Sequence, residues 1–147
     1  MAIMDAKATF AYEKVISGAA NAVISGSTIG TDGVINSGGI QIVDLGHAGD
    51  AVGQELTFKA FVGKTALTGS SGATVQVSLQ TSTATDSAWH DLVTGPTIAV
   101  TSATKGAKLF ECRVPSGCER YLRANVKIGT AAATGSGTVN MFLTKDL

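Results

Sequence analysis

The sequence predicts an all-β domain, a jelly-roll-like antiparallel β-sandwich with an extended N-terminal arm. Several short segments alternate apolar and polar residues with a period of two, which is the pattern of strands that bury one face. Clusters of Gly, Ser and Thr separate these segments, and no window shows helical periodicity long enough for a core helix. A chain of 147 residues is of ordinary size for one domain, so we expect a single sandwich.

The first two strands of the sandwich are predicted at Ile40–Leu45 and Gln54–Val62. Each has the alternation of a strand with one buried side. In the second strand, the spacing of two places four apolar side chains on one face: Leu56, Phe58, Ala60 and Val62. Both strands are therefore expected to contribute to the core.

The clearest strand pattern lies at Thr74–Thr81. Its apolar face is formed by Val75, Val77 and Leu79, and its polar face by Gln76, Ser78 and Gln80. We expect the polar face to contact water or a partner. A short edge strand is predicted next at Ser87–Val93, and a further strand segment at Thr97–Val100.

The remaining strands lie in the last third of the chain. Leu109–Val114 ends at a turn formed by Pro115-Ser116-Gly117, because Pro lacks the donor that a strand ladder needs and Gly tolerates left-handed turns. Glu119–Ile128 resumes the alternation with one apolar and one polar face. The last strand, Gly137–Thr144, has apolar residues on both faces, and either burial on both sides or a subunit contact over Phe142 would explain this pattern.

The first 39 residues differ from the rest of the chain. Residues 17–39 are rich in Gly and Ser and show little alternation, so ordering them costs much conformational entropy. We therefore divide the chain into an extended N-terminal arm with a strand-like start, residues 1–39, and a β-sandwich domain, residues 40–147. The arm has apolar residues without a clear stripe, and four of them are candidates for contact with a neighbouring subunit: Phe10, Tyr12, Val15 and Ile16.

The composition argues against two classes of partner. Charged residues form 15% of the chain, below the ~25% typical of soluble proteins, and the formal net charge is zero. Because binding to nucleic acid needs a concentrated positive face, we expect no direct nucleic-acid contact. The chain has no basic start followed by an apolar run and no stretch of ~18 apolar residues. We therefore expect no membrane contact and synthesis in the cytoplasm.

The residues that carry chemistry do not converge on a catalytic or cofactor site. His47 and His90 are the only imidazoles, whereas a zinc site needs three or four well-spaced ligands. Cys112 and Cys118 follow no metal-binding spacing, and we interpret them as free thiols. His90 and Asp91 are neighbours on a predicted strand, so their side chains point to opposite faces and do not form a proton relay. We expect no enzymatic activity, no metal and no cofactor.

The densest group of potential binding residues is Arg120, Tyr121 and Arg123. Arg and Tyr are enriched at protein interfaces, and Arg binds carboxylates through two nitrogens. An interface and a solvated face explain this group equally well. We take these three residues and Phe142 as interface candidates, beside the four in the arm.

Four segments follow, in order, the pattern of a known family: Met4-Asp5-Ala6 with Phe10, Ile42 to Gly46, Val75 to Ser82, and Val114 to Asn125. On these segments the chain resembles the small cement, or head-decoration, proteins of tailed phages, typified by the cement protein of a Bordetella phage. Arg120-Tyr121-Leu122-Arg123 is the most telling part of the likeness. The stretch from about Ala19 to Gly39 departs from it, because it is longer and richer in glycine than the corresponding link in the family.

The resemblance implies a capsid decoration protein, a virion structural protein with a jelly-roll-like fold and no catalysis. Such a protein is made in the host cytoplasm, binds the outer surface of the phage head and stabilises contacts between major capsid subunits. The implied partners are the major capsid protein and further copies of this chain, in a homodimer or homotrimer. We expect the arm to add a strand to a neighbour or to lie along it.

A carbohydrate- or receptor-binding β-sandwich displayed on the virion is the alternative from a different class. In that case Trp89 and Tyr121 would stack on sugar rings. A contiguous exposed aromatic platform would favour this alternative, whereas aromatic residues at a subunit contact would favour the decoration protein.

Overall fold

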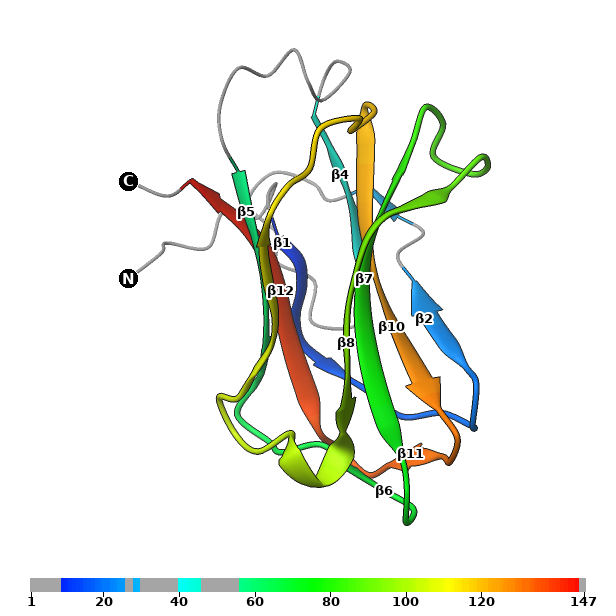
Figure 1. The fold of residues 1–147 in the computed structure, drawn as a ribbon, viewed down its shortest axis with the longest axis vertical. Coiled ribbons are helices and arrows are strands. Elements are labelled where there is room, and N and C mark those ends of the chain that lie inside the picture. The colour runs from blue at the N-terminus through cyan, green and yellow to red at the C-terminus, as the bar shows by residue number, and fades with distance from the viewer. Residues whose placement is uncertain (1–8, 26–27, 30–39, 46–55, 146–147) are drawn as a thin grey trace.

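A computed structural model describes residues 9–25, 28–29, 40–45 and 56–145. It confirms the all-β antiparallel sandwich that the sequence predicts (Figure 1). One sheet has four strands in the order β1-β12-β5-β9. These are β1 (Thr9–Val15), β12 (Thr138–Lys145), β5 (Leu56–Val62) and β9 (Lys108–Arg113).

The second sheet has six strands, of which five follow the order β3-β4-β10-β7-β8 and β2 pairs with β10. They are β2 (Val23–Ser25), β3 (Thr28–Ile29), β4 (Gln41–Asp44), β7 (Thr74–Ser82), β8 (His90–Ala99) and β10 (Tyr121–Gly129). A small ribbon of β6 (Thr68–Gly69) and β11 (Ala133–Thr134), with a 3-10 turn at Val100–Ser102, lies at one end of the sandwich (Figure 1).

The strand order is that of a jelly roll. The sheet β1-β12-β5-β9 faces a sheet in which β4, β10, β7 and β8 follow one another, so the chain crosses repeatedly between the two sheets. The first and last of these strands, β1 and β12, lie side by side and pair antiparallel. This is the double-sheet arrangement by which jelly rolls enclose one core.

The core lies between the inner faces of the two sheets. β10 contributes four buried side chains at a spacing of two: Leu122, Ala124, Val126 and Ile128. From the other sheet, the Phe58 ring meets the rings of Phe10 and Phe110 edge to face, with centroids 5.5 and 6.0 Å apart. Burying a side chain of this size stabilises the folded state by roughly 1.5–3 kcal/mol. The apolar residues of each strand therefore determine which of its faces points into the core.

The predicted arm of residues 1–39 is corrected for the part that the structure describes. β1 is an integral strand of the four-stranded sheet, and β2 pairs with β10 in the other sheet. Phe10 and Ile16 are 0% and 1% exposed, so both belong to the core of the sandwich. The sequence pattern failed here because the β1–β12 register shifts twice, which interrupts the alternation. Residues 1–8, 26–27 and 30–39 of the predicted arm lie outside the described residues.

Glu13 anchors β1 where its register against β12 shifts between Ala11 and Lys14. Its carboxylate accepts hydrogen bonds from the Lys64 backbone N–H at 3.1 and 3.2 Å, from Asn140 Nδ2 at 3.1 Å and from the Thr138 hydroxyl. Gly63 makes room for this carboxylate, since a Cβ there would collide with it. Burial raises the pKa of Glu13, but the hydrogen bonds from Thr138, Asn140 and Lys64 outweigh it, so the pKa lies below its ordinary value.

The strand predicted as short at Ser87–Val93 is corrected as well. It is the edge strand of its sheet, as expected, but β8 runs for ten residues. The segment predicted at Thr97–Val100 continues this strand as far as Ala99, and Val100 begins the 3-10 turn. Gly95 and Pro96 lie at a register shift against β7, which lets the strand continue past the proline. Gly95 is needed there, because a Cβ would approach the Phe110 ring to 2.7 Å.

The three long edge strands of the described sandwich are all irregular. β1 and β8 each have two register shifts against their neighbours, and β9 has one against β5. Bulges twist an edge strand and disrupt the ladder that an added strand would need. These described edges are therefore poorly suited to pairing with an added strand.

Phe10→Ala distinguishes a core strand from a free arm. We expect it to lower the free energy of unfolding by roughly 3–5 kcal/mol, because it empties the space beside Phe58. The control on the same strand is Tyr12→Ala, whose exposed ring should leave stability unchanged within about 0.5 kcal/mol. Urea unfolding followed by tryptophan fluorescence measures both. Equal stability of the two variants would contradict the placement of β1.

Glu13 should give the protein a pH-dependent contribution to stability. Because its pKa in the folded chain lies below 4.5, the contribution is fully present above pH 4.5 and is lost as the pH falls through the folded-state pKa. We expect Glu13→Gln to cost about 1 kcal/mol at pH 7, the low end for bonds to a charged group because Glu13 is partly exposed. Urea unfolding at pH 7 and at pH values below 4.5 should show this difference shrinking; a difference independent of pH would refute the role of the carboxylate.

Candidate functional site

The eight predicted interface residues do not form one surface. The interface role expected for Phe10 and Ile16 is corrected, because both side chains are covered by the protein's own core. Tyr12 and Val15 are 42% and 43% exposed on β1, at the edge of the four-stranded sheet. Phe142 is half-buried and lies opposite Lys59 of β5.

Arg120, Tyr121 and Arg123 do come together, at the start of β10. Leu122 and Ala124 point into the core, so Tyr121 and Arg123 point outward by the period of a strand. The register places Tyr121 between Asp44 of β4 and Ser82 of β7.

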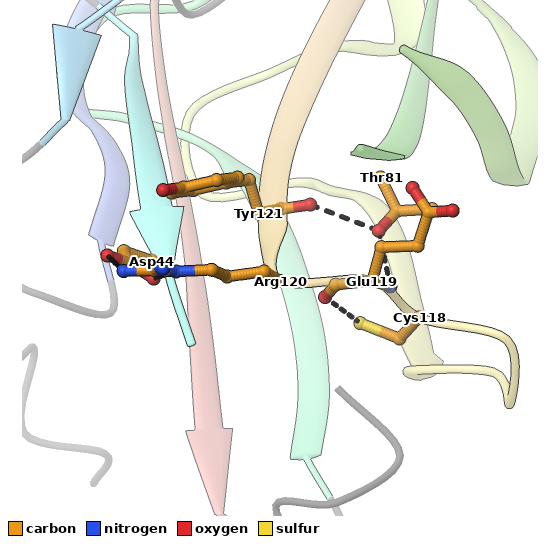
Figure 2. A network of polar contacts seen from close by, with 6 residues as sticks. All are labelled: Asp44, Thr81, Cys118, Glu119, Arg120 and Tyr121. Carbon is orange, nitrogen blue, oxygen red and sulfur yellow. Dashed lines mark hydrogen bonds and ion pairs between the residues drawn. The ribbon is translucent and has the colours of Figure 1, made fainter. Parts of the chain in front are cut away.

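Thr81 holds the start of β10 in place (Figure 2). Its buried hydroxyl donates a hydrogen bond to the Tyr121 carbonyl at 3.0 Å and accepts one from the Glu119 N–H at 2.7 Å. The Cys118 thiol donates to the Glu119 carbonyl at 3.5 Å. This short irregular segment therefore has its backbone groups satisfied by side chains, which keeps Arg120 and Tyr121 in a defined position.

Arg120 is held by an ion pair with Asp44. Its Nε and Nη2 lie 2.9 and 3.0 Å from the two carboxylate oxygens, and the Arg120 side chain reaches from the start of β10 toward Asp44 on β4 (Figure 2). The guanidinium also lies over the Tyr121 ring, 5.1 Å from its centroid. The hydrogen bond and the charge of Asp44 raise the pKa of Arg120. Because the pair is exposed, we assign it a positioning role and little stability.

Arg123 is held by an amide and an aromatic ring. Its Nε donates to Gln80 Oε1 at 2.8 Å, and its guanidinium lies 4.4 Å from the centroid of the Trp89 ring. Gln80 in turn donates to Asp91 Oδ1 at 2.9 Å. Burial lowers the pKa of Arg123, although a guanidinium stays charged at neutral pH.

We call the group formed by Arg120, Tyr121, Arg123 and Trp89 the arginine–aromatic surface. It crosses β4, β10, β7 and the start of β8, and its partners Asp44, Gln80 and Asp91 fix its side chains. Arg, Trp and Tyr dominate the binding energy of protein interfaces, especially when they lose little freedom on binding. The sequence identified its arginines and Tyr121, but not the partners, which come from strands far apart in the chain.

The remaining reactive side chains are scattered. Cys112 and Cys118 are free thiols, and burial raises the pKa of Cys112. His90 is exposed on β8, and His47 lies outside the described residues. Across the part of the chain that the structure describes, no cluster of three or more His, Cys, Asp or Glu side chains could hold a metal ion. The same residues include no helix long and apolar enough to span a membrane.

The structure defines a small jelly-roll protein with a fixed group of arginine and aromatic side chains on one sheet. The chain belongs to the Bbp16 family, whose model, described as Bbp16, matches residues 19–143. The match begins after β1 and extends into β12, so it includes the whole arginine–aromatic surface. No curated protein matches the chain.

Thr81→Val tests whether this hydroxyl supports the surface. The change keeps the shape but leaves the buried Glu119 N–H without its acceptor, so we expect a loss of roughly 1–3 kcal/mol in the free energy of unfolding. Thr94→Val, at an exposed position on β8, is the control and should have little effect. Chemical denaturation measures both variants, and equal stability of Thr81→Val and wild type would show that the hydroxyl is dispensable.

Proposed function

We propose that this protein is a capsid decoration, or cement, protein of a bacteriophage. The observation that carries the proposal is membership of the Bbp16 family, together with the resemblance of four ordered segments to head-decoration proteins. In this proposal the protein is made in the host cytoplasm and binds the outer surface of the phage head. Its partners are the major capsid protein and further copies of itself, in a homodimer or homotrimer.

The arginine–aromatic surface is the proposed capsid contact. Its guanidinium groups can bind carboxylates or backbone carbonyls of a partner, while Trp89 and Tyr121 bury apolar area beside them. Asp44 and Gln80 already hold both arginines, so binding costs less side-chain entropy. A modest affinity per copy suffices, because many copies on one shell act together.

The proposed mechanism differs from the one expected from the sequence. We expected an arm to add a strand to a neighbour, but β1 is built into the sandwich and the long edges are bulged. The proposal therefore assigns attachment to the sheet faces. It involves no catalytic step, no cofactor and no direct contact with nucleic acid or a membrane.

The carbohydrate-binding alternative requires Trp89 and Tyr121 to stack on sugar rings. Stacking on a sugar needs an open aromatic face, yet Trp89 and Tyr121 each have a guanidinium over one ring face. This arrangement favours a protein contact over a sugar platform. Glycan binding therefore serves as the contrasting outcome of the test below.

The test is co-sedimentation of the purified protein with mature capsids of its source phage that lack it, followed by heating to release packaged DNA. The proposal predicts saturable binding and a higher DNA-release temperature. Saturable binding without that increase would contradict a cement role and favour display or adhesion. Absence of binding, with binding to a glycan array, would replace the proposal by the alternative.

The arginine–aromatic surface makes a specific prediction for the same assay. We expect the double variant Arg120→Ala and Arg123→Ala to bind capsids roughly tenfold more weakly or worse, the effect of removing interface anchors. Its melting temperature should change little, since both side chains lie on the surface. Lys105→Ala, in an exposed turn before β9, is the matched control and should bind normally. Unchanged binding by the double variant would assign both arginines to solvent.

A further inference from the structure

The basic residues are distributed unequally between the two sheets. The strands of the four-stranded sheet carry five basic and two acidic residues: Lys14, Lys59, Lys108, Arg113 and Lys145, with Glu13 and Glu111. The described strands of the other sheet carry two of each: Arg123 and Lys127, with Asp44 and Asp91. One of the acidic groups of the first sheet, Glu13, already accepts hydrogen bonds from three residues. A chain of zero net charge thus has one sheet with an excess of positive charge.

The outer face of this sheet combines its cations with aromatic rings. Phe58, Ala60 and Val62 point into the core, so Lys59 and Phe61 point outward. The register places Lys59 opposite Phe142 on one side and Glu111 on the other, and Phe61 opposite Asn140 and Lys108. We call the outward group of Lys59, Phe61, Lys108, Asn140 and Phe142 the Lys59–Phe142 face.

The two lysines of this face form no close ion pair within the described part of the chain. Neither Lys59 nor Lys108 forms an ion pair with a described residue, and Glu111 lies across from Lys59 without pairing with it. Phe61 and Phe142 are half-buried and diagonal to each other across β5 and β12, so the rings keep some surface exposed between the lysines. Exposed rings flanked by cations are complementary to an apolar segment flanked by carboxylates.

We propose that the Lys59–Phe142 face is a second docking surface, and that it binds an acidic surface of the major capsid protein. This inference rests on the proposed function, and it adds to it the chemistry of one contact. A protein that stabilises the junction between two capsid subunits needs two separate contacts. The arginine–aromatic surface lies on the outer face of one sheet, and the Lys59–Phe142 face on the outer face of the other. The two surfaces therefore point in opposite directions across the sandwich.

An acidic protein surface fits this face better than nucleic acid does. Nucleic-acid binding rests on many cations that follow the phosphate backbone, whereas here the lysines alternate with two rings and an amide. The rings have to be covered by apolar groups, which a protein surface supplies together with its carboxylates. Electrostatic attraction would then determine the rate and orientation of docking, and ring burial would slow dissociation.

The test uses charge reversal and salt in the capsid co-sedimentation assay. Lys59→Glu and Lys108→Glu are compared with Lys105→Glu, which makes the same charge change in the exposed turn before β9, outside the paired strands. We expect each of the first two to weaken binding to capsids roughly tenfold at low ionic strength, and this difference to shrink as salt screens the attraction. The control should bind like wild type, and melting temperatures should confirm that all three variants fold.

The outcomes separate this inference from the proposed function. Failure of the wild-type protein to bind capsids would overturn the proposed function. Normal wild-type binding with unchanged binding by both Lys59→Glu and Lys108→Glu would overturn the docking face alone. An equal loss in Lys105→Glu would also overturn it, because the effect would then reflect overall charge. Weaker, salt-sensitive binding by the two face variants only would support it.

Discussion

The antiparallel pairing of β10 with β7 is the constraint on which the rest of the structure depends. The two strands pair without a register shift from Tyr121 opposite Ser82 to Gly129 opposite Thr74. This register sends Leu122 and its apolar neighbours into the core and places Arg123 opposite Gln80 on the outer face. A slip of one residue would exchange the two faces, so the same pairing that builds the core also positions the arginine–aromatic surface.

The pairing ladder also explains where binding can occur. Regular pairing is concentrated in the centre of each sheet, whereas β1, β8 and β9 at the edges have shifted registers. Such edges disfavour uncontrolled strand addition. The proposal therefore assigns recognition to the faces, where side chains rather than backbone groups would determine the partner. The two faces differ in chemistry: one presents arginines on aromatic rings, and the other presents lysines between phenylalanines.

Much of the fold could be predicted because alternation reports burial directly. This pattern identified β7 and β10, predicted at Thr74–Thr81 and Glu119–Ile128. Residue chemistry identified the turn at Pro115 to Gly117, where Gly117 has a φ of 90°. The N-terminal strand was expected only as the strand-like start of an arm. Its place in the sandwich was missed because two register shifts break its alternation, and Glu13 itself has a φ of 48°. Such a conformation is held by tertiary contacts with Thr138 and Asn140, which are distant in sequence. Likewise, Arg120 and Arg123 could be recognised as candidate interface residues from their residue type. Their contacts with Asp44 and Gln80 could not be predicted, because these contacts depend on the order of the strands in the sheet, which no local sequence pattern reveals.

The account's central claim is that this jelly roll binds the outside of a phage shell through its sheet faces. Electron cryomicroscopy of the heads of the source phage tests that claim most directly. The account predicts sandwich-shaped density on the outer capsid surface, with the arginine–aromatic surface against one capsid subunit and the lysine-bearing sheet against another. Density attached only through loops at the ends of the sandwich would contradict the assignment of attachment to the faces. Absence of the protein from the shell would contradict the central claim itself.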